Sequence, residues 1–208
     1  MKENNWFDPF YIQSHLNEEE SNIQKNVRDF CNNELKPTVV ERNRKNEFDQ
    51  SLYPKFGSLG VLGQTVKTHG GSGTSNLAYG LVAYEFEKID SSYRSSISVQ
   101  SSLVIHPINE FGSQEQKDKY LPPLIKGENI GCFGLTESEA GSDPTSMKTS
   151  FKKTKDGYII NGSKNWITNA PIADIFIIWA IEENKDHKSI KGFIIEKNTE
   201  GLNTSTIE

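Results

Sequence analysis

The chain has 208 residues, of which 34% are hydrophobic and 25% charged, and its formal net charge is −5. This length suffices for one or two compact domains with a real core, and the composition is typical of a soluble globular protein. The charges are mixed along the chain, and the lack of a basic stripe disfavours nucleic-acid binding.

The sequence contains no recognisable membrane span or targeting peptide, and its cysteines and histidines form no motif. No apolar run approaches the roughly 18 residues that a membrane-spanning helix needs. The stretch from Met1 to Trp6 resembles neither a signal peptide nor an Arg-rich transit peptide, so we expect the bacterial cytoplasm, with the mitochondrial matrix as the alternative. Cys31 and Cys132 lie far apart without CxxC spacing, which favours structural thiols. The four histidines are scattered and predict no metal site.

Helices are predicted through the first 127 residues. Asn17 precedes three glutamates, which is typical of a helix start, because its side chain caps free amides and carboxylates favour the positive end of the helix dipole. Pro37 is expected to end or bend this helix. A second helix is predicted over 49–59. The glycine-rich stretch 69–73 follows no strand and lacks the phosphate-loop pattern, so we expect a flexible turn.

Three further helices are expected before residue 127. Thr74 or Ser75 caps a helix that runs to residue 89, and a helix opening at Asp90 should be distorted near Pro107. Ser113 and Gln116 form a capping box for the last of them.

Short β-rich runs follow, punctuated by Gly, Asn, Asp and Pro. They cover 132–136, 157–161, 175–179 and 192–195. Turns are predicted at 155–157 and at Asn161-Gly162, the second being a strong hairpin signal. Neither βαβ alternation nor GxGxxG occurs, which disfavours a Rossmann nucleotide site. The expected fold is therefore α+β by segments, with an all-α region followed by an all-β region.

Two stretches in the β-rich region carry possible chemistry. Leu135-Thr136-Glu137 is followed, after three residues, by Gly141-Ser142-Asp143, and the run 158–169 contains Trp166-Ile167-Thr168-Asn169. Hydroxyls and free amides after a strand can bind a flavin edge or a pyrophosphate, but on chemistry alone they more often cap turns.

Together, these two stretches and the helical region before them closely resemble the acyl-CoA dehydrogenase family, from about Asp8 to the end of the chain. The resemblance implies an N-terminal α-helical domain over 1–127 and an incomplete middle β-domain of barrel or sandwich type over 128–208. It also implies FAD as cofactor. The FAD contacts that it implies are Phe133, Leu135, Thr136, Gly141, Ser142, Trp166, Ile167 and Thr168, with the Thr168 hydroxyl near flavin N5.

The stretch around Arg94 is similar to the glutaryl-CoA dehydrogenase branch of this family. There the matching arginine meets the distal carboxylate of the acyl chain, with Ser95 in the same pocket and Ser142 facing the CoA portion. A guanidinium fork suits carboxylate recognition. We expect this arginine to be buried, and monocarboxylic acyl chains, which offer no charge to pair with it, should then bind poorly.

The resemblance implies α,β-dehydrogenation of an acyl-CoA thioester. For glutaryl-CoA, decarboxylation to crotonyl-CoA follows, and electrons leave through an electron-transfer flavoprotein. The family's catalytic Glu and most of its tetramer contacts belong to a C-terminal helical domain that this sequence lacks. We therefore expect no catalytic base here, a marginally folded and inactive chain, and a doubtful homotetramer. Glu137 and Glu139 are not assigned as base.

Three hypotheses stand at this point. The chain is the N-terminal piece of a glutaryl-CoA-type enzyme, the same scaffold acting on another acyl-CoA, or a non-catalytic remnant that serves as an interaction module.

Overall fold

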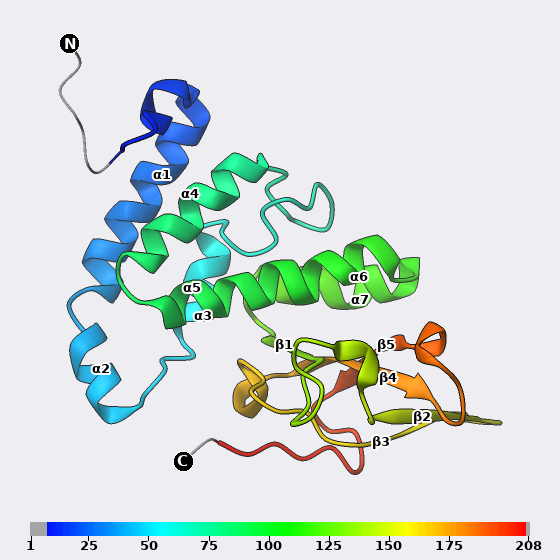
Figure 1. Ribbon diagram of the computed structural model, residues 1–208. Helices are drawn as coiled ribbons and strands as arrows, with labels where there is room; N and C mark the ends of the chain where they lie inside the picture. Colours follow the sequence, from blue (N-terminus) through cyan, green and yellow to red (C-terminus); the bar gives the residue numbers. More distant parts are fainter. Residues whose placement is uncertain (1–7, 207–208) are drawn as a thin grey trace.

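The computed structural model describes residues 8–206, and it has helices first and a five-stranded sheet second (Figure 1). The α-helices are α1 (Glu18–Phe30), α2 (Val39–Lys45), α3 (Leu52–Ser58), α4 (Asn76–Glu87), α5 (Ser91–Ser98), α6 (His106–Phe111) and α7 (Gln114–Ile125). The strands are β1 (Gly131–Gly134), β2 (Ser150–Thr154), β3 (Gly157–Asn161), β4 (Ile175–Glu182) and β5 (Lys191–Glu196). This order confirms the predicted α+β fold by segments.

Two π-helical stretches and four short 3-10 helices complete the secondary structure of residues 8–206. The π-helical stretches are η2 (Cys31–Leu35) and η3 (Val99–Ile105), and the 3-10 helices are η1 (Ile12–His15), η4 (Pro144–Ser146), η5 (Ala170–Ile172) and η6 (His187–Ser189). Pro37 follows η2 and Pro107 follows η3, so both prolines lie where the helical hydrogen-bond pattern has already changed.

Local capping signals fix the helix starts as predicted. Asn17 and Glu20 form a reciprocal capping box at α1, and Ser113 and Gln116 form another at α7. Ser75 caps α4. The helix predicted over 49–59 is α3, which is shorter, because it begins at Leu52 and ends at Ser58.

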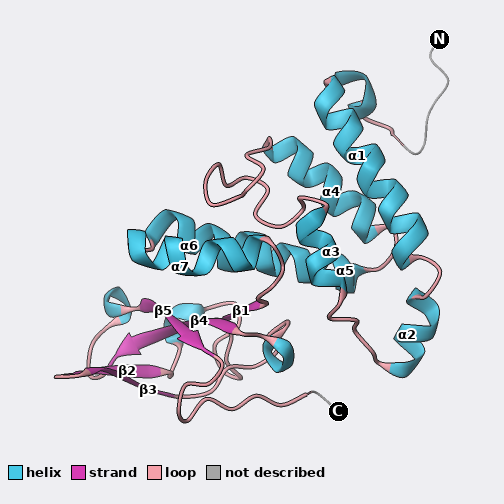
Figure 2. Ribbon diagram, turned by 180° about the vertical axis from the view of Figure 1, so that it is seen from behind, coloured by secondary structure: helices cyan, strands magenta, loops and turns pink. Residues whose placement is uncertain are grey.

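The helices enclose one hydrophobic core that the sheet joins. Phe56 and Phe86 meet edge to face at 5.3 Å in its centre, and Ile175 and Ile177 of β4 belong to the same cluster. Phe176, between them, points to the other face of the sheet and packs with Cys132, since successive strand residues alternate. Both views place α6 and α7 beside the sheet (Figures 1 and 2).

The sheet is mixed rather than purely antiparallel. Strand β4 pairs in parallel with β1 along 175–178 and with β2 at 181–182, while β5 pairs antiparallel along its opposite edge. Strand β2, which the sequence pattern did not single out, forms the hairpin with β3 through the two-residue loop 155–156.

The predicted hairpin at Asn161-Gly162 is therefore wrong. A Cβ atom at Gly162 would lie 2.4 Å from the Thr149 hydroxyl oxygen, and the φ angle of Gly162 is +152°. Glycine is needed here because the backbone passes close to Thr149, not because the chain reverses into a neighbouring strand.

No helix among residues 8–206 is long and apolar enough to cross a membrane. Trp6, for which we expect a place in the core because no motif surrounds it, lies outside the described residues.

Candidate functional site

The first stretch predicted to bind a cofactor, residues 132–147, is called here the Thr136 segment. It leaves the sheet at the end of β1 and turns tightly, since Glu137 and Ala140 exchange two backbone hydrogen bonds of 3.2 Å. Leu135 and Thr136 are half-buried, while Gly141 and Ser142 are exposed. Phe133 faces inward, with its ring 6.0 Å from that of Trp179.

The second stretch, residues 164–169, is called here the Trp166 segment. The Trp166 side chain is 71% exposed, which excludes an ordinary aromatic of the β core. Its φ angle is +61°, a left-handed conformation that is rare for a bulky residue. Ile167 packs against the cluster of Cys132, Ala173 and Phe176, so it anchors the segment on the sheet while Trp166 and Thr168 stay exposed.

Hydrogen bonds join the two segments directly. The Asn165 amide donates to the carbonyl of Thr136 at 2.9 Å, and Lys164 Nζ donates to the carbonyl of Leu135 at 2.9 Å. Asn169 donates from its side chain to the carbonyl of Gly131 at 3.1 Å, next to the start of the Thr136 segment. Two stretches about thirty residues apart in sequence therefore form one surface.

A buried ion pair lies beneath this surface. Lys164 Nζ is 2.7 Å from Glu137 Oε1, and the two side chains are only 7% and 9% exposed. Glu137 also accepts hydrogen bonds from the amides of Lys148 at 2.7 Å and Thr149 at 3.0 Å. Burial alone would raise the pKa of Glu137, but these donors outweigh it and lower the pKa to about 2. A carboxylate held in its charged form this firmly is a poor general base.

Free hydrogen-bonding groups remain on the joined surface. The hydroxyls of Thr136, Ser142 and Thr168 bond to no other group within residues 8–206. A Cβ atom added at Gly141 would meet nothing within 4 Å, so the backbone there is open to a bound molecule. Within the described part of the chain, no three His, Cys, Asp or Glu residues gather in a way that could hold a metal ion.

Arg94 and Ser95 lie on α5 and bond to neither segment. Arg94 Nε donates to Glu87 at the end of α4, at 2.7 Å, and the two side chains are 37% and 46% exposed. The hydrogen bond from Arg94 lowers the pKa of Glu87. Arg94 is therefore half-exposed rather than buried as expected, and its two terminal nitrogens bond to nothing else in residues 8–206.

The helix that carries Arg94 is nevertheless tied to the first strand. It continues as η3, where Gln100 is fully buried and accepts a hydrogen bond from the Gly131 amide at 2.7 Å. Gln100 also donates to the carbonyls of Leu124 at 2.9 Å and Asn129 at 2.8 Å. Sequence reasoning missed Gln100, Glu87 and the pairing of Lys164, because no local pattern marks a partner that is distant in sequence.

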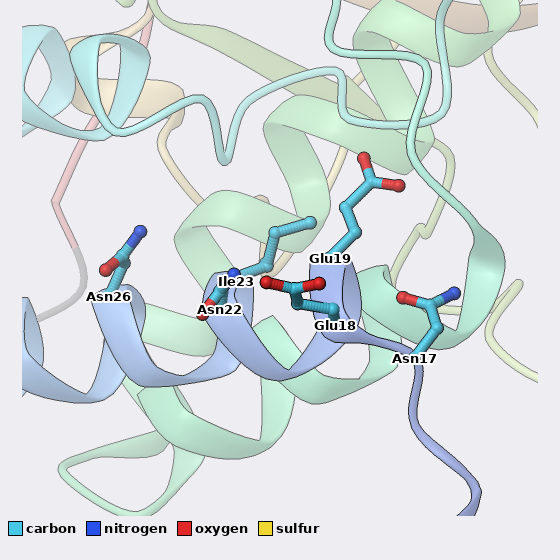
Figure 3. Close-up of a pocket in the computed structure, with 6 residues that line it drawn as sticks. All are labelled: Asn17, Glu18, Glu19, Asn22, Ile23 and Asn26. Atoms are coloured by element: carbon cyan, nitrogen blue, oxygen red, sulfur yellow. The ribbon is translucent and has the colours of Figure 1, made fainter.

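A hollow on the outer surface of α1 is a weaker candidate (Figure 3). Its lining consists of Asn17, Glu18, Glu19, Asn22, Ile23 and Asn26, and it lies on the side of the molecule away from the sheet (Figure 1). Most of these side chains are exposed, and the two carboxylates among them, Glu18 and Glu19, lie on the exposed first turn of α1. The joined surface remains the better candidate.

Comparisons with known proteins find relatives of both the helical region and the sheet region. Residues 17–128 match the model of the acyl-CoA dehydrogenase N-terminal domain, and residues 132–208 match that of the middle domain. The short-chain-specific acyl-CoA dehydrogenase of Clostridium acetobutylicum is 39% identical over 195 residues, which are 93% of this chain and 52% of that protein. The mitochondrial isovaleryl-CoA dehydrogenase of Pongo abelii is 38% identical over 91% of this chain and 46% of its own length.

Among solved structures, a glutaryl-CoA dehydrogenase from Mycobacterium smegmatis in complex with FADH2 superposes with a TM-score of 0.91. It is 39% identical and covers 96% of this chain, which in turn covers 50% of that structure. The chain thus spans about half the length of the curated relatives it matches.

Proposed function

Because the chain belongs to the acyl-CoA dehydrogenase family, we propose that it carries the flavin side of an active site for FAD-dependent α,β-dehydrogenation of an acyl-CoA thioester. The observation that carries this proposal is the junction of the Thr136 and Trp166 segments. It presents an exposed indole beside hydroxyls without partners. An aromatic ring system with polar edges, such as an isoalloxazine, complements such a surface.

In this proposal FAD, when bound, supplies the hydride acceptor. Thr136 and the Leu135 backbone orient one edge of the flavin, and Ser142 and Gly141 lie along it. Trp166 covers the ring system and excludes water, and the Thr168 hydroxyl donates near the reacting nitrogen. Phe133 and Ile167 support these contacts from the sheet side.

No residue of this chain is assigned as the base that removes the substrate α-proton. Glu137 is unsuited, since it is paired with Lys164 and has a pKa near 2. Glu139 is exposed and pairs with Lys148. In the complete enzyme we expect the base to come from another part of the polypeptide and the electrons to pass to an electron-transfer flavoprotein.

The cofactor proposal is tested by titrating the purified chain with FAD and following the quenching of flavin fluorescence. We expect saturable binding, weakened about five- to tenfold by Trp166→Ala, since loss of an aromatic stack amounts to about 1–1.4 kcal/mol. Phe111→Ala is the matched control, because Phe111 is 85% exposed on α6 and outside the proposed site. Equal affinity of the two variants would contradict the assignment of Trp166.

For the substrate, we propose a dicarboxylic acyl-CoA such as glutaryl-CoA, whose acyl chain is recognised by Arg94 and Ser95. Support comes from the half-exposed guanidinium, which Glu87 holds through Nε alone, so that its terminal fork is free for a carboxylate. A short-chain monocarboxylic acyl-CoA is the alternative, because the short-chain-specific relative is as similar in sequence as the glutaryl-CoA enzyme.

Equilibrium binding of glutaryl-CoA and butyryl-CoA distinguishes the two substrates. Arg94→Ala should weaken glutaryl-CoA binding about 10- to 100-fold and leave butyryl-CoA binding unchanged, because a charged hydrogen bond contributes about 1.5–3 kcal/mol. Arg44→Ala, an exposed arginine on α2, is the control. A similar loss of affinity for both ligands would contradict the proposal that Arg94 recognises the distal carboxylate.

A further inference from the structure

The ion pair between Glu137 and Lys164 has no assigned role in flavin contact, yet it lies directly beneath the proposed site. We infer that Lys164 is a positioning residue, which, paired with Glu137, holds Trp166 in its left-handed backbone conformation against the Thr136 segment. The consequence for FAD rests on the proposed function, whereas the positioning of Trp166 does not.

Backbone strain is concentrated in the Trp166 segment. Trp166 has a φ angle of +61° and Asn169 of +70°, so two left-handed residues occur within four positions. Asn tolerates this conformation, but a bulky aromatic does not, and such a residue persists only where its surroundings impose the conformation. The exposed indole makes few contacts of its own that could do so.

The contacts that impose the conformation lie on both sides of Trp166. Before it, Lys164 donates to Leu135 and to Glu137, and the Asn165 amide donates to Thr136. After it, the Asn169 side chain donates to Gly131 and the Ala170 amide to Ile167. Of these contacts, only the one between Lys164 and Glu137 joins two charges, and both side chains are more than nine-tenths buried.

Glu137 is itself held in place, so the pair has a fixed end. Its two oxygens accept the amides of Lys148 and Thr149, just before β2. The Thr149 hydroxyl donates to the Ser163 carbonyl at 3.4 Å, immediately before Lys164. The pair therefore joins three segments in one hydrogen-bond network: the residues just before β2, the Thr136 segment and the Trp166 segment.

Such a pair is better suited to fixing geometry than to adding stability. Replacing a buried ion pair by apolar groups is often neutral, because desolvation of the charges offsets their attraction. A pair with several additional hydrogen bonds, by contrast, specifies one arrangement of the segments that it joins.

The test compares Lys164→Met with Lys148→Met in the full 208-residue chain labelled with 5-fluorotryptophan. Both variants remove one positive charge near a glutamate, but the pair of Lys148 with Glu139 is exposed at 76% and 70%. The Trp166 fluorine resonance is identified by its disappearance in Trp166→Phe. We expect Lys164→Met to shift or broaden this resonance and to leave the Trp179 resonance in place, and Lys148→Met to change neither.

Flavin affinity is measured on the same samples. Lys164→Met should weaken FAD binding about five- to tenfold and Lys148→Met less than twofold. If the wild-type chain binds no FAD but the Trp166 resonance still moves in Lys164→Met, the positioning inference holds and the proposed function fails. An unmoved Trp166 resonance in a folded Lys164→Met chain overturns the inference.

A second variant keeps the inference testable should Lys164→Met fail to fold. The double substitution Glu137→Gln with Lys164→Met leaves no buried charge unpaired, so we expect the fold to persist while the Trp166 resonance still moves. If the double variant also unfolds, the pair is a general stability element and the positioning role is refuted. If it folds with the Trp166 resonance unmoved, the role is refuted as well.

Discussion

The acid sensitivity of the chain should be traceable to Glu137. Its pKa falls from the ordinary value of 4.5 to about 2 on folding. A carboxylate with a lowered folded pKa stabilises the native state above its unfolded pKa, and this contribution is lost as the pH falls toward the folded value. Lowering the pKa of Glu137 from 4.5 to about 2 corresponds to about 3 kcal/mol of stability at pH 7 and about 1 kcal/mol at pH 3.

Glu137→Gln removes this dependence. The difference in unfolding free energy between wild type and variant should shrink by about 2 kcal/mol between pH 7 and pH 3, which is about 1 M in the urea midpoint at a typical slope of about 2 kcal/mol/M. Urea melts followed by circular dichroism at pH 7, 5, 4 and 3 measure it. Glu139→Gln is the control, because Glu139 pairs with a lysine on the exposed surface and should contribute little. A difference that stays constant with pH, or equals that of the control, would refute the assignment of the low pKa to Glu137.

Further predictions concern the scaffold and are checked by the same urea melts. Gln100→Leu should destabilise the chain by about 3 kcal/mol or more, since the Gly131 amide and two carbonyls lose their buried partner, whereas the exposed Gln114→Leu should be near neutral. Gly80→Ala in α4 should stabilise by about 0.5–1 kcal/mol, because its Cβ meets nothing within 4 Å. Gly57→Ala should destabilise the folded chain, because the added Cβ would lie 2.1 Å from the Lys126 carbonyl oxygen. An unfolding midpoint equal to that of the wild type would contradict this packing.

Features set by neighbouring residues were predictable from the sequence alone. The capping boxes at Asn17 and Ser113 appear as predicted, because both members of each lie three residues apart on the same turn. The order of helices before strands follows from hydrophobic periodicity, which is also local. The Thr136 and Trp166 segments were recognised by their resemblance to a family, not by their chemistry.

Features that join distant residues were decided only by the tertiary structure. Asn161-Gly162 carries the local signal of a hairpin, but the close passage of Thr149 and the pairing of β2 with β3 override it. The half-exposed state of Arg94 depends on how α5 and the end of α4 pack, which its own segment does not specify.

The Thr136 and Trp166 segments show the same division. Their residues were visible in the sequence, yet nothing local predicted that Lys164 would be buried against Glu137, or that Trp166 would be exposed with a left-handed backbone. By its own chemistry a charged lysine prefers solvent and an apolar tryptophan prefers burial. The structure has the opposite, with the Lys164 side chain buried and the Trp166 side chain exposed. Only the network of hydrogen bonds between the two segments makes the reverse arrangement stable, and that network forms only when the chain is folded.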